Sequence, residues 1–208
     1  MRSAIFPMVA AGHDGCSRLR AAAVVALAGA ALVAGCATFL PQSRAPVMPA
    51  AFDLIGRVAA SHDGNRFFSN VRWHHLSNGE EIWLLTPAGQ TLARIVSDAD
   101  GATLTGADRS EYRGSDVESL TRQVLGWELP LTYMGWWVRG EAAPDGTVQD
   151  VARDGQSRYV ALSQGGWRVT MTWGDGGAGS GLPRRLEFAS GSDQIRLVID
   201  GWRPVGQQ

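Results

Sequence analysis

The sequence contains no lysine, since all 19 of its basic residues are arginine. This absence excludes chemistry that depends on a lysine amine, such as Schiff-base catalysis or the phosphate-binding lysine of a P-loop. The 20 acidic residues balance the arginines, so no basic excess favours a nucleic-acid partner. The two cysteines, Cys16 and Cys36, are too few for a disulfide scaffold or a multi-cysteine metal site.

Glycine and tryptophan, in contrast, are abundant. The chain has 208 residues, of which 45% are hydrophobic, and this suits one globular domain. Its 26 glycines and 8 tryptophans predict many short strands joined by tight turns around a large aromatic interior.

The N-terminal segment has the pattern of a lipoprotein signal peptide. Arg18 and Arg20 precede an apolar run over residues 21–34, which is shorter than the about 20 residues of a membrane-spanning helix but typical of a signal-peptide core. The run ends in small residues before Cys36, and this resembles the lipobox, in which cleavage precedes a cysteine that becomes lipidated. The alternatives are a plain secretion signal with a chance cysteine, or a buried helix.

This pattern predicts three regions. Residues 1–35 are expected to be the signal peptide, and residues 36–51, which contain three prolines, a flexible tether that begins at the lipidated Cys36. Residues 52–205 are expected to form the folded domain. Ala37, which follows the cysteine, resembles the sorting signal for the outer membrane, so we expect a lipid-anchored protein that faces the periplasm.

From Phe52 onward, apolar and polar residues alternate mostly with period two, which predicts a mainly β domain. Residues 141–155 are polar and contain glycine and proline, which predicts a loop. The expected strands are 52–58, 66–75, 81–86, 90–97, 102–105, a short piece near Tyr112, 157–162, 167–173, 186–188 and 194–199.

Two helices are expected between the two groups of strands. Ser115 and Glu118 form a capping-box pattern, and the helix that they open would end at Gly126. Pro130 can open a second helix that ends at Gly140. Strands, helices and strands with hairpin-length links indicate an antiparallel sheet that curls, with helices closing its open face.

The usual catalytic patterns fail when they are tested one by one. His74 and His75 point to opposite faces of a strand and cannot chelate one metal, so we interpret them as surface histidines. The G-x-G-x-x-G pattern over residues 174–179 precedes a strand rather than a helix, which indicates a hairpin loop. Asp98, Asp100 and Asp108 are interpreted as turn residues rather than calcium ligands. We therefore expect no enzyme activity, no cofactor and no metal.

A series of short motifs nevertheless follows a fixed order along the chain. They are the lipobox ending in Cys36, Phe52-x-Leu54-x-Gly56-Arg57, Trp73, Leu84-Leu85-Thr86-Pro87-x-Gly89, Leu125-Gly126-Trp127-x-Leu129-Pro130, Trp137-x-Arg139-Gly140, Gly166-Trp167-x-Val169, Leu182-Pro183, Ile195-Arg196-Leu197 and Trp202. Their order and spacing resemble the LolB family of outer-membrane lipoprotein receptors.

The resemblance implies an unclosed, half-barrel antiparallel sheet with a helical lid, here over about residues 115–139. It also implies a monomer that accepts acylated lipoproteins from the periplasmic carrier LolA and inserts them into the outer membrane. By face and aromatic character, the expected lining of an acyl-chain cavity is Leu54, Phe68, Trp73, Trp83, Leu85, Leu120, Trp127, Met134, Trp136, Trp137 and Trp173.

The turn of Pro87, Ala88 and Gly89 corresponds to the family's membrane-insertion loop, which typically presents a bulkier apolar residue than Ala88. Two other hypotheses stay open at this point. One is a structural or assembly lipoprotein with a filled core and no acyl-chain transfer. The other is a lipid-cleaving enzyme, which would need a nucleophile and a base that the sequence does not display.

Overall fold

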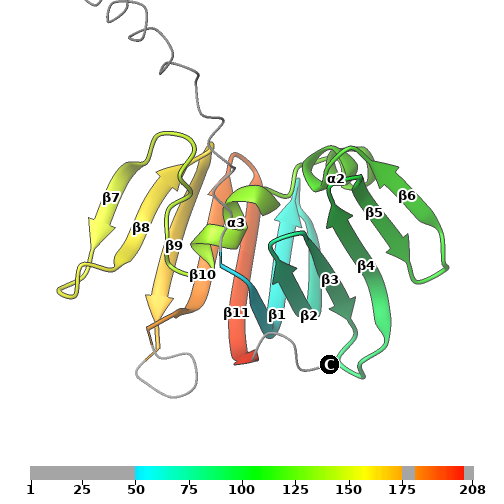
Figure 1. Ribbon diagram of the computed structural model, residues 1–208, viewed down its shortest axis with the longest axis horizontal. Helices are drawn as coiled ribbons and strands as arrows, with labels where there is room; N and C mark the ends of the chain where they lie inside the picture. The colour runs from blue at the N-terminus through cyan, green and yellow to red at the C-terminus, as the bar shows by residue number, and fades with distance from the viewer. Residues whose placement is uncertain (1–49, 175–180, 204–208) are drawn as a thin grey trace, which may run out of the picture. The chain divides into compact units, whose positions relative to one another are not determined.

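The computed structural model describes residues 50–174 and 181–203 (Figure 1). The expected signal peptide, Cys36 and nearly all of the tether lie outside the described residues, as does most of the glycine-rich stretch over residues 174–179. Val47–Gln208 is a compact unit, and the core residues described in it lie between Phe52 and Trp202. The unit therefore carries its own core and can fold by itself.

Within the described residues the strands form one 11-stranded sheet in the order β6-β5-β4-β3-β2-β1-β11-β10-β9-β8-β7. Neighbouring strands pair antiparallel throughout. The elements are β1 (Phe52–His62), β2 (Asn65–Leu76), β3 (Gly79–Leu85), β4 (Thr91–Asp98), β5 (Gly101–Gly106), β6 (Glu111–Gly114), α2 (Val117–Leu125), α3 (Leu131–Trp137), β7 (Gln149–Arg153), β8 (Tyr159–Gln164), β9 (Trp167–Trp173), β10 (Pro183–Ser190) and β11 (Asp193–Arg203).

The two edge strands, β6 and β7, leave the sheet unclosed, and both helices pack on one of its faces. α2 contacts β5 and β6, whereas α3 lies over β10 and β11 in Figure 1. Side chains from both helices join the sheet's inner residues in one hydrophobic core. The predicted fold class, mainly β with an unclosed antiparallel sheet and a helical segment, is confirmed.

Alternation along β1 places Phe52 and Leu54 on the face that the helices cover, as predicted, and both are buried. A bulge in the pairing with β11 follows at Ile55/Gly56. A Cβ atom at Gly56 would lie 2.3 Å from the carbonyl oxygen of Val198, so only glycine allows the two backbones to approach this closely.

The start of α2 differs from the expected capping box. Asp116, not Ser115, is the N-cap, and its carboxylate accepts a hydrogen bond from the Ser119 amide at 2.7 Å. Glu118 does not reach back to the cap, because its carboxylate instead accepts bonds from the backbone and the hydroxyl of Thr132. It therefore joins α2 to the first turn of α3. The predicted helix end at Gly126 is confirmed by a left-handed φ of 84°.

The expected loop over residues 141–155 was wrong in part, since it contains β7. All five residues of this edge strand are exposed, and its pairing with β8 is irregular. Alternation of polarity reports which face of a strand is buried. A strand with no buried face therefore leaves no such signal. None of the helices in the described part of the chain is both long enough and apolar enough to cross a membrane.

Candidate functional site

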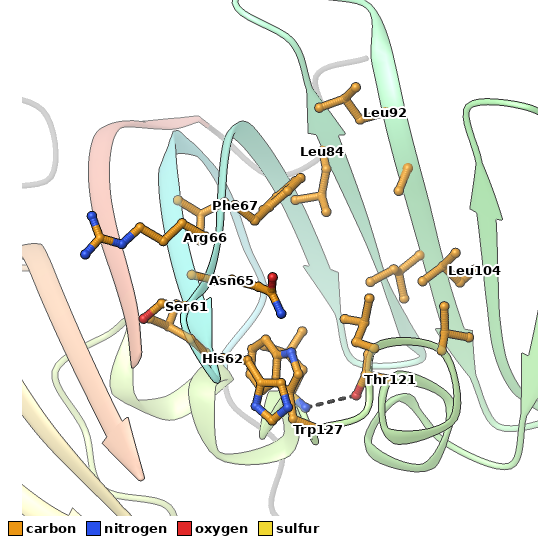
Figure 2. Close-up of a pocket in the computed structure, with 18 residues that line it drawn as sticks. Ser61, His62, Asn65, Arg66, Phe67, Leu84, Leu92, Leu104, Thr121 and Trp127 are labelled. Carbon is orange, nitrogen blue, oxygen red and sulfur yellow. Dashed lines mark hydrogen bonds between the residues drawn. The ribbon is translucent and has the colours of Figure 1, made fainter. Parts of the chain in front are cut away.

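A pocket of about 400 Å³ lies between α2 and the inner face of the sheet (Figure 2). Most of its wall is apolar, and four of its five polar members lie at the hairpin between β1 and β2, the fifth being on α2. The apolar lining is Val58, Ala60, Phe67, Leu84, Leu92, Ala93, Ile95, Leu104, Val124, Leu125, Trp127, Leu129 and Ile195. The polar lining is Ser61, His62, Asn65, Arg66 and Thr121.

Short side chains create this hollow. Ala60 is paired with Phe67 across β1 and β2, and Ala93 is paired with Leu84 across β3 and β4. An alanine at each of these inward positions leaves the space that a larger side chain would otherwise fill beneath α2. The pocket therefore depends on small residues as much as on large ones.

The buried hydroxyl of Thr121 does not make the pocket polar. It donates to the carbonyl of Val117 at 2.9 Å and accepts from the backbone amide of Leu129 at 2.9 Å, a bond drawn in Figure 2. Both the donor and the acceptor of the hydroxyl are thus satisfied. The second bond also holds the connection between α2 and α3 against the helix.

Trp127, on that connection, lies against His62 at one end of the pocket. The two rings are nearly parallel, with an angle of 19° and centroids 6.2 Å apart. His62 Nδ1 is 2.5 Å from the carboxylate of Asp193, and Nε2 is 3.5 Å from that of Asp63. The hydrogen bond to Asp193 is the main reason that the pKa of His62 is raised above its ordinary value.

Beneath α3 the same face of the sheet is filled. The indole of Trp137 is fully buried, stacks on Phe188 with centroids 5.8 Å apart and lies 5.5 Å from the ring of Tyr133. Its Nε1 donates to the side-chain oxygen of Gln164, which is also buried and bonded to the backbone of Ala143. Large side chains with satisfied polar groups thus occupy this half of the interior.

The structure places the predicted cavity residues in four groups. Trp127 lines the pocket. Buried in the core are Leu54, Trp73, Leu120, Met134 and Trp137. Trp136 and Trp173 are half-buried, and Trp173 donates from Nε1 to the carbonyl of Tyr159.

The fourth group, Phe68, Trp83 and Leu85, shares the outer face of the sheet. Phe68 is 69% exposed and is paired with Ala59, one position away from the Phe67–Ala60 pair that lines the pocket. Trp83 is paired with Arg72, whose guanidinium lies 5.1 Å from its ring centroid. A shift of one residue moves a strand side chain to the opposite face, so these three lie outside the pocket.

Sequence reasoning missed Phe67 and Leu84 on the same two strands. Counting back from the buried Trp73 in steps of two reaches Phe67, not Phe68. The same rule, applied to β3 from the buried Ile82, selects Leu84 rather than Trp83 or Leu85. The alternation thus indicated which residues face inward, but selecting residues for their aromatic character led to the wrong positions.

Pro87, Ala88 and Gly89 form an exposed turn between β3 and β4. The amide of Gly89 donates to the carbonyl of Thr86 at 2.9 Å, and Gly89 has a left-handed φ of 83°. Along the chain, the turn lies between Leu84 and Leu92, both of which line the pocket.

The predicted opposition of His74 and His75 agrees with their different surroundings. His74 Nδ1 lies 3.6 Å from Asp53, whereas the ring of His75 stacks on Phe52 at 5.0 Å on the inner face. The interpretation of His75 as a surface residue was wrong, because it is only 4% exposed. In residues 50–174 and 181–203, no group of three or more His, Cys, Asp and Glu side chains is placed to hold a metal ion.

The aspartates interpreted as turn residues do have that role. Asp98 accepts from the amide of Asp100 at 2.8 Å, and Asp108 accepts from the amide of Ser110 at 3.0 Å. Hydrogen bonds from Ser110 lower the pKa of Asp108 below its ordinary value. The carboxylates therefore stabilise the two loops.

Comparison with known proteins gives a consistent family. The family model described as outer membrane lipoprotein LolB matches residues 50–202. An outer-membrane lipoprotein LolB of Nitrosomonas europaea is 40% identical over 78% of this chain and 77% of its own length. The protein of the same name from Chromobacterium violaceum is 36% identical over 86% of this chain and 98% of its own length.

Among solved structures, a LolA superfamily protein from Nitrosomonas europaea covers 78% of this chain and 90% of its own, with a TM-score of 0.49 and 10% identity. That likeness is too slight to assign a function. The family model, however, spans both helices, the pocket and all of the sheet except the last residue of β11. The chain therefore belongs to the LolB family of outer-membrane lipoproteins.

Proposed function

We propose that this protein accepts acylated lipoproteins from the periplasmic carrier LolA and inserts them into the outer membrane. The lipidated Cys36 anchors the domain to that membrane, facing the periplasm, and the domain works as a monomer without a cofactor or a catalytic step. The observation that carries the proposal is the apolar pocket beneath α2.

The energetics of a lipoprotein anchor explain why such a pocket is needed. About three acyl chains hold on the order of 45 methylenes, and exposing them to water would cost roughly 35 kcal/mol at ~0.8 kcal/mol each. Transfer through water is therefore excluded, and a receiving protein must offer an apolar site directly to the carrier. If the receiving protein binds the lipoprotein only ~1.4 kcal/mol more tightly than the carrier does, the equilibrium already favours transfer tenfold.

The volume of the pocket supports one acyl chain as the bound unit. A 150 Å³ protein cavity holds benzene, which corresponds to about 25 Å³ per carbon. On this scale the about 400 Å³ beneath α2 accommodates about 16 carbons, the length of one common fatty acyl chain. The pocket therefore takes one chain of the anchor, and the other chains are shielded by the carrier or by the membrane.

The turn of Pro87, Ala88 and Gly89 is placed to deliver the chain. It is exposed, and it joins the two pocket residues Leu84 and Leu92. The methyl group of Ala88 buries little surface in a bilayer. Insertion therefore relies on the lipid anchor at Cys36 as well as on this turn.

The test is a transfer experiment with the isolated unit, residues 47–208. LolA loaded with a triacylated lipoprotein is mixed with this unit, and a pull-down shows which protein holds the lipoprotein. We expect it to move to the unit. Ala93→Trp, which fills the pocket, should block this movement, whereas Ala152→Trp on the exposed edge strand β7 should not.

Lipoprotein that stays on LolA, together with no binding of a fluorescent acyl probe, would contradict the proposal. That result would favour the structural lipoprotein, in which the interior serves only to hold the fold together. Equal transfer to the wild-type and Ala93→Trp units would instead place the acyl site outside this pocket.

A further inference from the structure

His62 stands where three separate segments of the chain meet at one end of the pocket. It is the last residue of β1, and Asp193, whose carboxylate lies 2.5 Å from its Nδ1, is the first residue of β11. Its other neighbour, Trp127, belongs to the connection between α2 and α3. Figure 2 shows the imidazole and the indole side by side at the end of the pocket opposite Leu92.

The two ends of the connection are fixed differently. At its C-terminal end, the amide of Leu129 is bonded to Thr121, and the amide and hydroxyl of Thr132 are bonded to Glu118. At its N-terminal end stands Gly126, in the left-handed conformation of a helix C-cap. Trp127 follows this glycine, packs half-buried against the hydrophobic core and stacks on His62.

We propose that His62 is the positioning residue that holds Trp127 in place as a wall of the acyl pocket, and that protonation of the imidazole strengthens this hold. The proposal deepens the proposed function, because it concerns the same pocket and rests on acyl binding there. In the protonated state, His62 donates a charge-assisted hydrogen bond to Asp193 and presents a cation to the indole face. In the neutral state, both contacts weaken.

The charges around the imidazole favour protonation. Asp193 from β11 and Asp63 from the turn after β1 are both within 3.5 Å of a ring nitrogen. From β2, Arg66 also lines the pocket, and its positive charge opposes them. On the connection itself, the charge of Glu128 is paired with Arg122 of α2. The raised pKa of His62 agrees with this balance, so the contact with Trp127 is tightest below that pKa and loosens as pH rises through it.

The first measurement follows Trp127 directly. The indole N–H resonance of Trp127 is identified in the NMR spectrum of the unit by its loss in Trp127→Phe, and it is followed from pH 5.5 to 8.5. We expect it to shift with the titration of the His62 ring protons. The shift should disappear in His62→Phe, which keeps a stacking ring without a charge.

The second measurement follows the affinity for an acyl chain over the same pH range. The probe is a dansyl-labelled fatty amide, which does not titrate there. We expect binding to weaken by about two- to fivefold as His62 loses its proton, the range of an exposed cation–π contact. His62→Phe should flatten this dependence, and Asp193→Asn should move its midpoint to lower pH. His74→Gln, which changes an imidazole on the outer face, should change neither.

A Trp127 resonance that does not follow the titration of His62 would overturn the inference. So would a pH dependence of probe binding that persists unchanged in His62→Phe. If the probe does not bind at any pH while the Trp127 resonance still titrates, the proposed function fails and the contact of His62 with Trp127 stands. The thermal midpoint of each variant, measured in parallel, separates these results from loss of the fold.

Discussion

The two helices cover the same face of one sheet, but the interior beneath α3 is filled and the interior beneath α2 is hollow. Under α3, Trp137 and Phe188 fill the space, and their neighbour Gln164 satisfies the polar atoms. Under α2, alanines at positions 60 and 93 leave a hollow of about 400 Å³. Interiors of stable proteins are close-packed, so we expect the α3 half to contribute most to stability and the α2 half to bind the acyl chain.

The largest expected effect comes from emptying the filled half. Trp137→Ala removes a fully buried indole and leaves the side-chain oxygen of Gln164 without one of its donors. We expect the free energy of unfolding to fall by about 3–5 kcal/mol, measured by urea denaturation of the unit. Trp127→Ala, in the hollow half, should lower it far less and weaken acyl binding instead. Equal losses of stability would remove the distinction between the halves.

The next largest effect is expected when the affinity of the hollow half is measured for acyl probes of different chain length. Because each buried methylene contributes ~0.8 kcal/mol, which is about fourfold in Kd, affinity should rise steeply with the chain length of an acyl probe. The rise should end near about 16 carbons, where the volume beneath α2 is filled. Fluorescence titration of the unit with probes of increasing length measures this. A rise that continues well beyond that length would show that the pocket opens further when it binds.

The alternation along β1 and the helix end at Gly126 could be predicted from the sequence because each follows from one local rule. The same alternation also indicated which side chains of β2 and β3 face inward, but the existence of a hollow there could not be predicted, for a physical reason. It exists where side chains are short, at Ala60 and Ala93, and a search for aromatic residues passes over such positions. That search selected Trp83, which lies on the outer face between the guanidinium groups of Arg72 and Arg94.

The contact between Glu118 and Thr132 marks a second limit. The spacing of Ser115 and Glu118 fits a capping box, and nothing local excludes it. The observed contact joins two helices, and it depends on how α3 starts after the connection. The edge strand β7 was missed for a related reason, since a fully exposed strand is defined by its pairing partner and not by its own pattern.

A substitution in the turn next to the hollow half is expected to strengthen membrane binding. Ala88→Leu adds about three carbons to an exposed turn, which should strengthen binding to a bilayer by roughly 2 kcal/mol. Co-sedimentation of the unit with vesicles of phosphatidylethanolamine and phosphatidylglycerol measures this. Ala152→Leu, on the exposed edge strand at the far end of the sheet, is the matched control. An equal gain in both variants would mean that the turn has no special role at the membrane.

The smallest effect concerns the cap that holds α2 over the hollow. Asp116→Ala removes the bond to the Ser119 amide and should lower the free energy of unfolding by about 1 kcal/mol. That bond also lowers the pKa of Asp116 below its ordinary value. The carboxylate therefore stabilises the fold above the pKa of about 3.9 that it has in the unfolded chain, and this contribution is lost as pH falls through the lower folded value.

The difference in stability between wild type and Asp116→Ala should accordingly be constant near neutral pH and shrink in acid. Urea denaturation of both proteins at several pH values between 2 and 7 measures it. Asp154 is the control, because its pKa is also lowered, mainly by its bond to Arg158, but it lies between β7 and β8, away from α2. Acyl binding should weaken in acid through the loss of the Asp116 cap and be unaffected by Asp154→Ala. If acyl binding did not weaken in acid, or if Asp154→Ala weakened it, α2 would not control access to the hollow half.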